Sequence, residues 1–170
     1  MYLNQLRISG RPRFFGYLAL SLMFAGVALA VENRPLPSFE VQNLDGSVVN
    51  TSTWAMEGKW VLIYLEGQCG PCTHLLARLT KEQYPQLASR TIIIVAGSQP
   101  SDVKMLQKGF TDLAQASWYA DPTRNAPKTL NLHGAPVTLG IQDKTIRWGI
   151  SGIPPAPGLL PAVLKKWSAQ

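Results

Sequence analysis

The chain has only two cysteines among its 170 residues, Cys69 and Cys72. So few cysteines exclude the dense disulfide framework that supports many small secreted domains. They also exclude a structural zinc site built from four cysteines, because no further thiol ligand exists. The chain is instead 46% apolar, and its length suggests one domain with its own hydrophobic core.

Charged residues are scarce as well, at 15% of the chain, and the surplus is basic, with 16 Lys and Arg against 10 Asp and Glu. No acidic residue precedes Glu32. The basic residues of that part are Arg7, Arg11 and Arg13. Without residues 1–30 the net charge therefore falls by three, from +6 to +3. The largest basic cluster of the remainder is Lys165-Lys166, so the sequence indicates no nucleic-acid partner.

An almost unbroken apolar stretch covers residues 14–31, directly after the arginines. Ala28-Leu29-Ala30 supplies the small residues that a signal peptidase requires, which predicts a secretory signal over residues 1–30. The alternative is an uncleaved membrane anchor, because the 18 residues of this stretch just suffice to span a bilayer. In both cases we expect a periplasmic body that contacts the membrane only through this segment. A linker (residues 31–37) then leads into one domain (residues 38–168).

The two cysteines form a Cys-x-x-Cys pair in the stretch Cys69-Gly70-Pro71-Cys72. An apolar run (residues 60–65) precedes it, and a helical pattern (residues 71–84) follows, with proline in the first turn, where it is favoured. A bridge across so short a loop constrains the unfolded chain little, so the pair is better placed for thiol–disulfide exchange than for stability. A structural disulfide and half of a metal site are the alternatives to the redox-active pair that we predict.

The remaining patterns predict a mixed sheet. The runs at 60–65 and 91–96 are almost wholly apolar, which is typical of parallel strands covered on both faces. Asp45-Gly46 predicts a hairpin turn, and residues 142–144 predict a second one. The predicted strands are 39–42, 47–49, 60–65, 91–96, 117–119, 137–141 and 145–150. The predicted helices are 71–84, 101–109, 121–130 and 159–167, and their order indicates an α/β fold with helices on both faces of the sheet.

The sequence also resembles a known family. Cys69-Gly70-Pro71-Cys72 is the active-site tetrapeptide of thioredoxins, and residues 37–168 resemble the exported TlpA/ResA-like branch of the thioredoxin fold. The matching segments are FEVQNLDGSVVNTSTW, GKWVLIYLEGQCGPC, TIIIVAGSQPSDVKMLQKGF and GAPVTLGIQDKTIRWGISG. The resemblance implies thiol:disulfide oxidoreductase activity and a thioredoxin-like three-layer sandwich. In that fold a mixed central sheet has helices on both faces, here with an N-terminal β-hairpin extension.

Three positions depart from thioredoxins. Gln68 replaces the usual Trp before the first cysteine, Ile63 replaces a buried acid, and Val137 replaces the Thr that usually follows the proline opposite the dithiol. The usual proton acceptor is therefore not carried over to this chain. An acid appears instead at Glu66, three residues before Cys69.

The resemblance implies a role for each residue of the site. Cys69 is the nucleophile, since a helix N-terminus stabilises the attacking thiolate, and Cys72 is the resolving thiol. Pro136 is expected to follow a cis bond from Ala135, in a loop that faces the dithiol and pairs with the substrate chain. The expected substrate contacts are Gly70, Pro71 and Ala135.

Three further residues have open roles. Glu66 either takes the proton from Cys72 or tunes the pair, or it is a solvated carboxylate at the end of a strand. His74 and His133 are more simply explained as surface histidines, although His133 lies three residues before Pro136.

These residues predict an exported thiol:disulfide oxidoreductase that acts on protein substrates. The Gly-Pro dipeptide of thioredoxin favours a reductase, in cytochrome c maturation or disulfide repair, which needs electrons from a membrane thiol donor. A disulfide donor or isomerase is the alternative. Isomerases usually dimerise, and no dimerisation segment is evident, so we expect a monomer.

An alternative of another class is a copper-binding assembly chaperone with Cys69, Cys72 and His133 as ligands. The two-residue spacing of the cysteines argues against it. A thiol peroxidase is disfavoured because Glu66 occupies the position of its threonine. For the oxidoreductase we expect neither a cofactor nor a resident metal.

Overall fold

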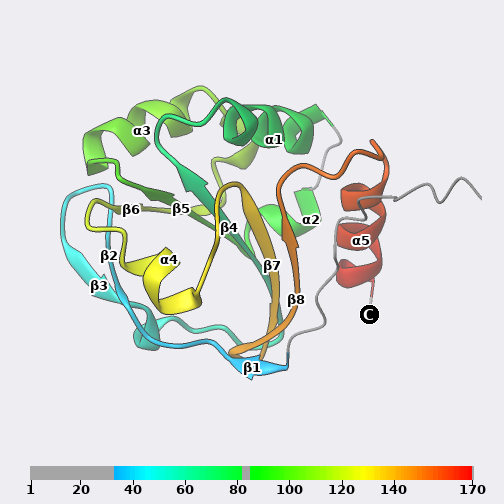
Figure 1. Cartoon of the computed structure of the whole chain (residues 1–170), viewed down its shortest axis with the longest axis horizontal. Coiled ribbons are helices and arrows are strands. Elements are labelled where there is room, and N and C mark those ends of the chain that lie inside the picture. The colour runs from blue at the N-terminus through cyan, green and yellow to red at the C-terminus, as the bar shows by residue number, and fades with distance from the viewer. Residues whose placement is uncertain (1–32, 82–84, 170) are drawn as a thin grey trace, which may run out of the picture.

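The computed structural model describes residues 33–81 and 85–169. The strands form one eight-stranded mixed sheet in the order β1-β8-β7-β4-β5-β6-β2-β3 (Figure 1). Its elements, in chain order, are β1 (Arg34–Pro35), β2 (Glu40–Gln42), β3 (Val48–Asn50), the 3-10 helix η1 (Thr51–Thr53), β4 (Lys59–Glu66), α1 (Gly70–Lys81), α2 (Pro85–Ala88), β5 (Thr91–Ala96), α3 (Pro100–Lys108), the 3-10 helix η2 (Thr111–Leu113), β6 (Ser117–Asp121), α4 (Asn125–Leu130), β7 (Val137–Gln142), β8 (Thr145–Ser151) and α5 (Leu159–Ser168).

Strand β4 lies in the middle of the sheet because it is apolar on both faces. It pairs in parallel with β5 and antiparallel with β7. Successive side chains of a strand point to opposite faces, so Ile63 and Leu65 enter one core cluster while Leu62 and Tyr64 enter another. The burial on both faces that the apolar run predicted is confirmed.

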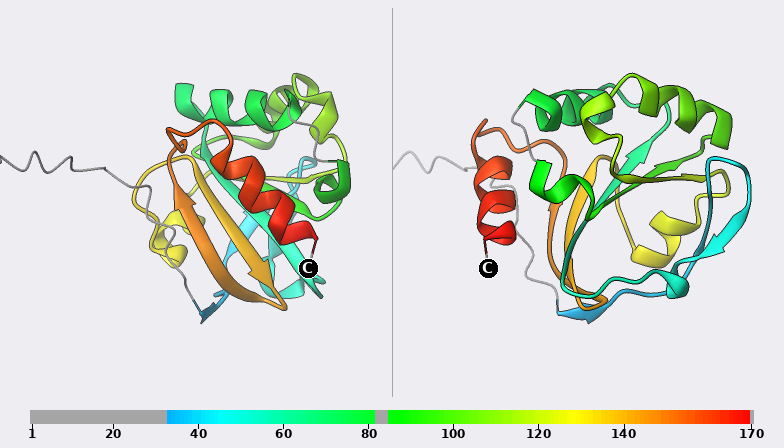
Figure 2. Two further views of the ribbon diagram at one scale, coloured as in Figure 1. Left: turned by 90° about the vertical axis from the view of Figure 1, so that its right-hand side faces the viewer. Right: turned by 180° about the vertical axis from the view of Figure 1, so that it is seen from behind.

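Helices cover both faces of the sheet (Figure 1, Figure 2). On one face, α1, α2, α3 and α5 contribute to a single apolar cluster, to which Leu76, Val103 and Leu164 belong. On the other face, α4 and the segment after η1 contribute Leu130 and Trp54 to the second cluster. The expected three-layer sandwich is therefore confirmed.

Both predicted hairpins are present, and β2 joins the N-terminal hairpin to the sheet through β6. Two differences from the prediction concern prolines. Arg34–Pro35, expected in the linker, pairs with β8 as an edge strand. Pro85, expected only to stop a helix, begins the short helix α2. Both places suit proline, because neither an edge strand nor a first helical turn requires its missing N–H.

The predicted signal or anchor, residues 1–30, lies outside the described residues, as do the first two residues of the expected linker. Within the described part of the chain, no helix is long and apolar enough to cross a membrane. Export and cleavage therefore stay predictions.

Candidate active site

Cys69 and Cys72 lie where β4 leads into α1, and they form a disulfide with an S–S distance of 2.05 Å and a Cα–Cα distance of 5.2 Å. The backbone N–H of Cys72 donates to Sγ of Cys69 at 3.1 Å. The carbonyl oxygen of Cys69 accepts from the N–H groups of Cys72 and Thr73, which closes the first helical turn. The N–H of Cys72 and the dipole of α1 favour a negative charge on the sulfur of Cys69.

The two sulfurs differ in exposure. Cys72 is 3% exposed and belongs to the apolar cluster beneath α1, whereas Cys69 is half-buried at the edge of that cluster. A substrate sulfur can therefore reach Cys69 from solvent, while Cys72 can attack only from the protein side. This asymmetry agrees with the predicted roles of nucleophile and resolving thiol.

A loop before β7 completes the site on the other side of Cys69. The peptide bond between Ala135 and Pro136 is cis, as predicted. Sγ of Cys69 lies 4.0 Å from the carbonyl oxygen of Ala135. The N–H of Gly152 donates to the carbonyl oxygen of Pro136 at 2.7 Å, so a third segment, after β8, joins the site.

Arg78 of α1 ties this third segment to the helix of the dithiol. Its guanidinium donates to the carbonyl oxygen of Pro154 at 3.5 Å and to that of Pro157. Sequence reasoning did not identify Arg78, because the two acceptors lie 76 and 79 residues further along the chain. No local pattern marks a contact over such a separation.

Glycines leave the surface over the site open. A Cβ added at Gly70, Gly134 or Gly152 would meet no atom within 4 Å. The φ angles of Gly134 (+103°) and Gly152 (+76°) lie in the left-handed region that favours glycine. A polypeptide can therefore approach the backbone of the site closely.

Glu66 lies at the end of β4 on the same side as Tyr64, which is the side away from α1. Its carboxylate accepts from the hydroxyl of Tyr64 at 3.2 Å and pairs with the guanidinium of Arg124 at 3.2 Å. Burial, and then the neighbouring carboxylate of Glu66, raise the pKa of Tyr64 above its ordinary value. Arg124 is a second residue that sequence reasoning missed, because it lies 58 residues from Glu66.

Ile63 lies on the opposite side, in the same cluster as Cys72, and is 2% exposed. At the position where thioredoxins bury an acid, this chain thus has an apolar residue that is surrounded by apolar side chains. Among the described residues, the one buried acidic side chain is Asp121. It caps α4 by accepting from the N–H groups of Asn125 and Ala126, at 2.8 Å each, and lies on the Tyr64 side of the sheet.

Both histidines are exposed, His74 on α1 and His133 in the loop before Ala135. No three His, Cys, Asp or Glu side chains in the described part of the chain lie close enough together to hold a metal ion. The structure, in which the cysteines form a disulfide, therefore does not assemble Cys69, Cys72 and His133 as a set of copper ligands.

Comparison with known proteins gives similar structures but no similar sequences: no family model and no curated protein matches the chain. A putative thiol:disulfide interchange protein DsbE from Chlorobium tepidum is 17% identical, with a TM-score of 0.58 over 84% of this chain and 100% of that one. A secreted Mycobacterium tuberculosis disulfide oxidoreductase homologous to E. coli DsbE is 12% identical, with a TM-score of 0.59 over 78% of this chain and 96% of that one. A peroxiredoxin-like protein from Aquifex aeolicus is 13% identical, with a TM-score of 0.59 over 82% and 89%. The chain has the thioredoxin-like fold.

Proposed function

We propose that the protein is an exported thiol:disulfide oxidoreductase that exchanges its Cys69–Cys72 pair with protein substrates. The observation that carries this proposal is the arrangement of the two sulfurs at the start of α1. Cys69 is accessible and lies 4.0 Å from the carbonyl oxygen of Ala135, while Cys72 is buried behind it. The likeness of the fold to disulfide oxidoreductases supports the proposal by analogy, and the N-terminal segment supports export.

The exchange proceeds in two steps. The thiolate of Cys69 attacks one sulfur of a client disulfide, forms a mixed disulfide and releases the other client sulfur as a thiolate. The thiolate of Cys72 then attacks Sγ of Cys69, forms the Cys69–Cys72 disulfide and releases the second client sulfur. Two electrons pass from the dithiol to the client, and its two thiolates take up the two protons that the dithiol lost.

The loop around Pro136 and the dipeptide Gly70-Pro71 form the surface that contacts the client. The open space over Gly70 and Gly134 leaves room for a polypeptide there, and the backbone of Ala135 provides groups for it to pair with. Small disulfides need no such surface, so this arrangement favours protein clients.

Within this class we assign the protein to the TlpA/ResA-like branch, as a monomeric reductase for cytochrome c maturation or for the repair of wrong disulfides. Gly70-Pro71 supports this direction, since it is the dipeptide of thioredoxin, whose potential is about −270 mV against about −120 mV for the oxidant DsbA. A reductase in an oxidising compartment consumes its dithiol, so a membrane thiol donor must return two electrons after each turnover. Disulfide donation or isomerisation is the alternative direction.

Trapping tests the two cysteine roles. The Cys72→Ala variant should accumulate mixed disulfides with exported proteins through Cys69, because the thiol that resolves them is missing. Non-reducing electrophoresis followed by mass spectrometry identifies the linked residues. The Cys69→Ala variant is the matched control and should trap nothing. Trapping through Cys72 in this control would reverse the roles, and no trapping in either variant would overturn the function.

The second arm of the same experiment tests the direction of electron flow. The Cys69–Cys72 pair is equilibrated with mixtures of reduced and oxidised glutathione, and its potential is read from the fraction of free thiol. We expect a value near that of thioredoxin. A value near about −120 mV would replace the reductase by a disulfide donor.

A further inference from the structure

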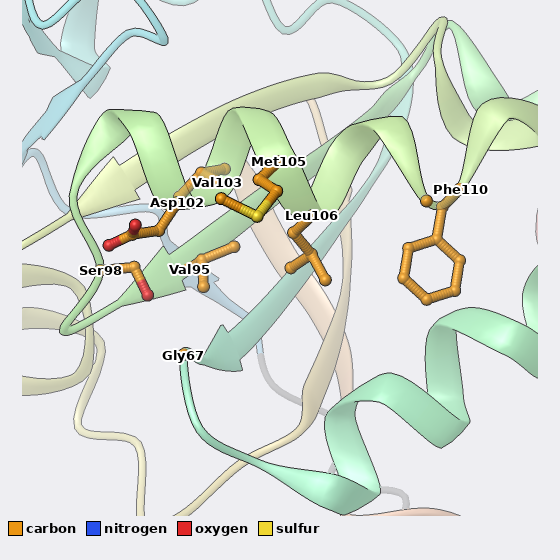
Figure 3. A pocket seen from close by; sticks show the side chains of 9 residues that line it. Gly67, Val95, Ser98, Asp102, Val103, Met105, Leu106 and Phe110 are labelled. Atoms are coloured by element: carbon orange, nitrogen blue, oxygen red, sulfur yellow. The ribbon is translucent and has the colours of Figure 1, made fainter.

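An apolar groove lies beside the loop that carries the dithiol (Figure 3). Val95 of β5 and Val103 of α3 form its floor, each 1% exposed. Leu106 and Phe110 form its walls, and Gly67 closes it on the side of the dithiol. Its volume of about 440 Å³ lies within the range of pockets that bind ligands.

The groove adjoins the loop that carries Cys69 through Gly67. Leu106, Phe110 and Cys69 are half-buried side chains packed against one and the same core cluster. Gly67 precedes Cys69 by two residues, and two residues of extended chain span at most about 7 Å. The Gly67 edge of the groove therefore lies within about 7 Å of the Cα atom of Cys69, which is about the reach of one or two client residues.

A second pocket, of about 560 Å³ and polar, adjoins the groove. The two pockets share Gly67, Ser98 and Asp102, and the polar one also reaches Gln68, the neighbour of Cys69. Together they form one cleft with an apolar end beside α3 and a polar end lined by Glu66, Gln68 and Arg124.

Met105 stands at the rim of the apolar end (Figure 3). Its side chain is 71% exposed, and among the described residues only one other large apolar side chain is similarly exposed, Val48 at 61% on the edge strand β3. Methionine is flexible and polarisable, and it adapts to apolar partners of different shape. An exposed methionine at this place therefore suits a variable apolar occupant.

We propose that this apolar groove, made of Val95, Val103, Met105, Leu106 and Phe110, binds a large apolar side chain of the client polypeptide. The inference rests on the proposed function and names its substrate class. An extended client advances about 3.3 Å per residue, so the bound side chain lies two or three residues from the client's reacting cysteine.

The charges of the cleft add a second preference. Glu66 is paired with Arg124, whereas Asp102 accepts one backbone N–H from Gln99 at 3.3 Å and lines both pockets where they meet. An acidic client side chain is repelled there. The expected order of clients is therefore leucine or phenylalanine first, serine next and aspartate last.

The test uses seven-residue peptides, each joined to a second copy of itself through its one cysteine. Leu, Phe, Ser or Asp stands two or three residues before or after that cysteine, and the other positions are Ser and Gly. The reduced full-length protein converts each dimer to two peptide thiols and becomes oxidised at Cys69–Cys72, and the second-order rate is measured. We expect Leu or Phe peptides to react about tenfold faster than Ser peptides at one of these positions, and Asp peptides to react slowest.

Variants then locate the preference. Met105→Asp and Leu106→Asn should reduce the rate ratio of Leu or Phe peptides to Ser peptides to less than about twofold. Both variants should leave the rate with glutathione disulfide unchanged. Val48→Asp is the matched control and should keep the preference, because it alters the other exposed apolar side chain, on β3. Circular dichroism verifies that each variant is folded. If a variant does not fold, the rates of the peptide series with the unaltered protein still test whether a large apolar side chain is preferred.

Equal rates for Leu and Ser peptides at every position would overturn the proposal that the groove binds a client side chain. A preference for Leu peptides that survives in both folded groove variants would overturn it as well. In these outcomes the protein still reduces glutathione disulfide, so the proposed function stands. A protein that reduces neither glutathione disulfide nor any peptide would overturn the proposed function and the groove together.

Discussion

The two sides of strand β4 have different surroundings at the end that leads to the dithiol. On the α1 side, Ile63 lies with Cys72 in an apolar cluster. On the other side, Tyr64 donates to Glu66, and Glu66 pairs with Arg124. This set of polar and charged side chains thus lies on the side of the sheet away from Cys72. Neighbouring residues of one strand create two different environments, because their side chains alternate between the faces.

This difference makes the dithiol asymmetric. Apolar surroundings disfavour the charged thiolate of Cys72, whereas the N–H of Cys72 and the dipole of α1 favour that of Cys69. The accessible sulfur is then also the better nucleophile. The buried sulfur reacts when its partner is held in a mixed disulfide next to it.

A carboxyl group placed among the apolar side chains on the dithiol side of β4 would remove the difference between its two sides. We expect this change to have the largest effect on stability. The Ile63→Asp variant should lose about 3 kcal/mol of its free energy of unfolding, because the side chain is 2% exposed among apolar groups. Burial raises the pKa of this new carboxyl in the folded state, so stability is lost as the pH rises through and above the unfolded value of about 3.9. Chemical denaturation between about pH 4 and about pH 8 measures the loss.

The matched control for that variant is Ile63→Asn, which has nearly the same shape and no charge. The difference in stability between the two variants should grow with pH, since only the aspartate ionises. A difference that stays constant would show that a group on the dithiol side compensates the charge, and the contrast between the two sides would fail.

Much of the fold followed from local patterns. The apolar runs of β4 and β5 and the turn at Asp45-Gly46 are signals within a few residues of one another, and so is the helix start beside Cys69. The place of the cysteine pair at the start of α1 was predictable for the same reason, because Cys-x-x-Cys at a helix start is a local motif.

The polar side of the site was not predictable. In a run that is apolar at every position, the alternation between faces leaves no trace in the sequence, so the side to which Glu66 points could not be read. Arg124 reaches it from 58 residues away. The groove was hidden too, because Leu106 and Phe110 resemble ordinary core residues until the adjoining pocket is seen.

Removal of the Tyr64 hydroxyl tests the polar side of β4, and we expect a smaller loss of stability from it than from Ile63→Asp. The Tyr64→Phe variant should lose about 1 kcal/mol near neutral pH, because it loses the hydrogen bond to Glu66. The raised pKa of Tyr64 adds stability that is present below its ordinary value of 10.0 and is lost as the pH rises beyond it. The gap between variant and wild type, measured by denaturation, should therefore narrow above about pH 10.

A constant gap would mean that the Tyr64 hydroxyl ionises as easily in the folded as in the unfolded chain, and the buried contact with Glu66 would be wrong. The pKa of Tyr119 is raised as well, chiefly by burial, so a dependence on alkaline pH persists in both proteins. Only the difference between the two proteins reports on Tyr64.

The smallest expected effect concerns Glu66 itself, and it decides between the two roles considered for this residue. Its carboxylate is 37% exposed, faces away from the cluster of Cys72 and is paired with Arg124, so its field at the dithiol is weak. The Glu66→Gln variant should therefore reduce glutathione disulfide within about twofold of the wild-type rate between about pH 6 and about pH 9, and Arg124→Gln, the matched change of the partner, should do the same. A proton acceptor for Cys72 behaves differently, because its removal slows the reaction more than about tenfold and shifts the pH profile of the rate. Such a result for Glu66→Gln alone would make Glu66 part of the catalytic machinery, and the separation of Glu66 from Cys72 would then hold only in the disulfide form.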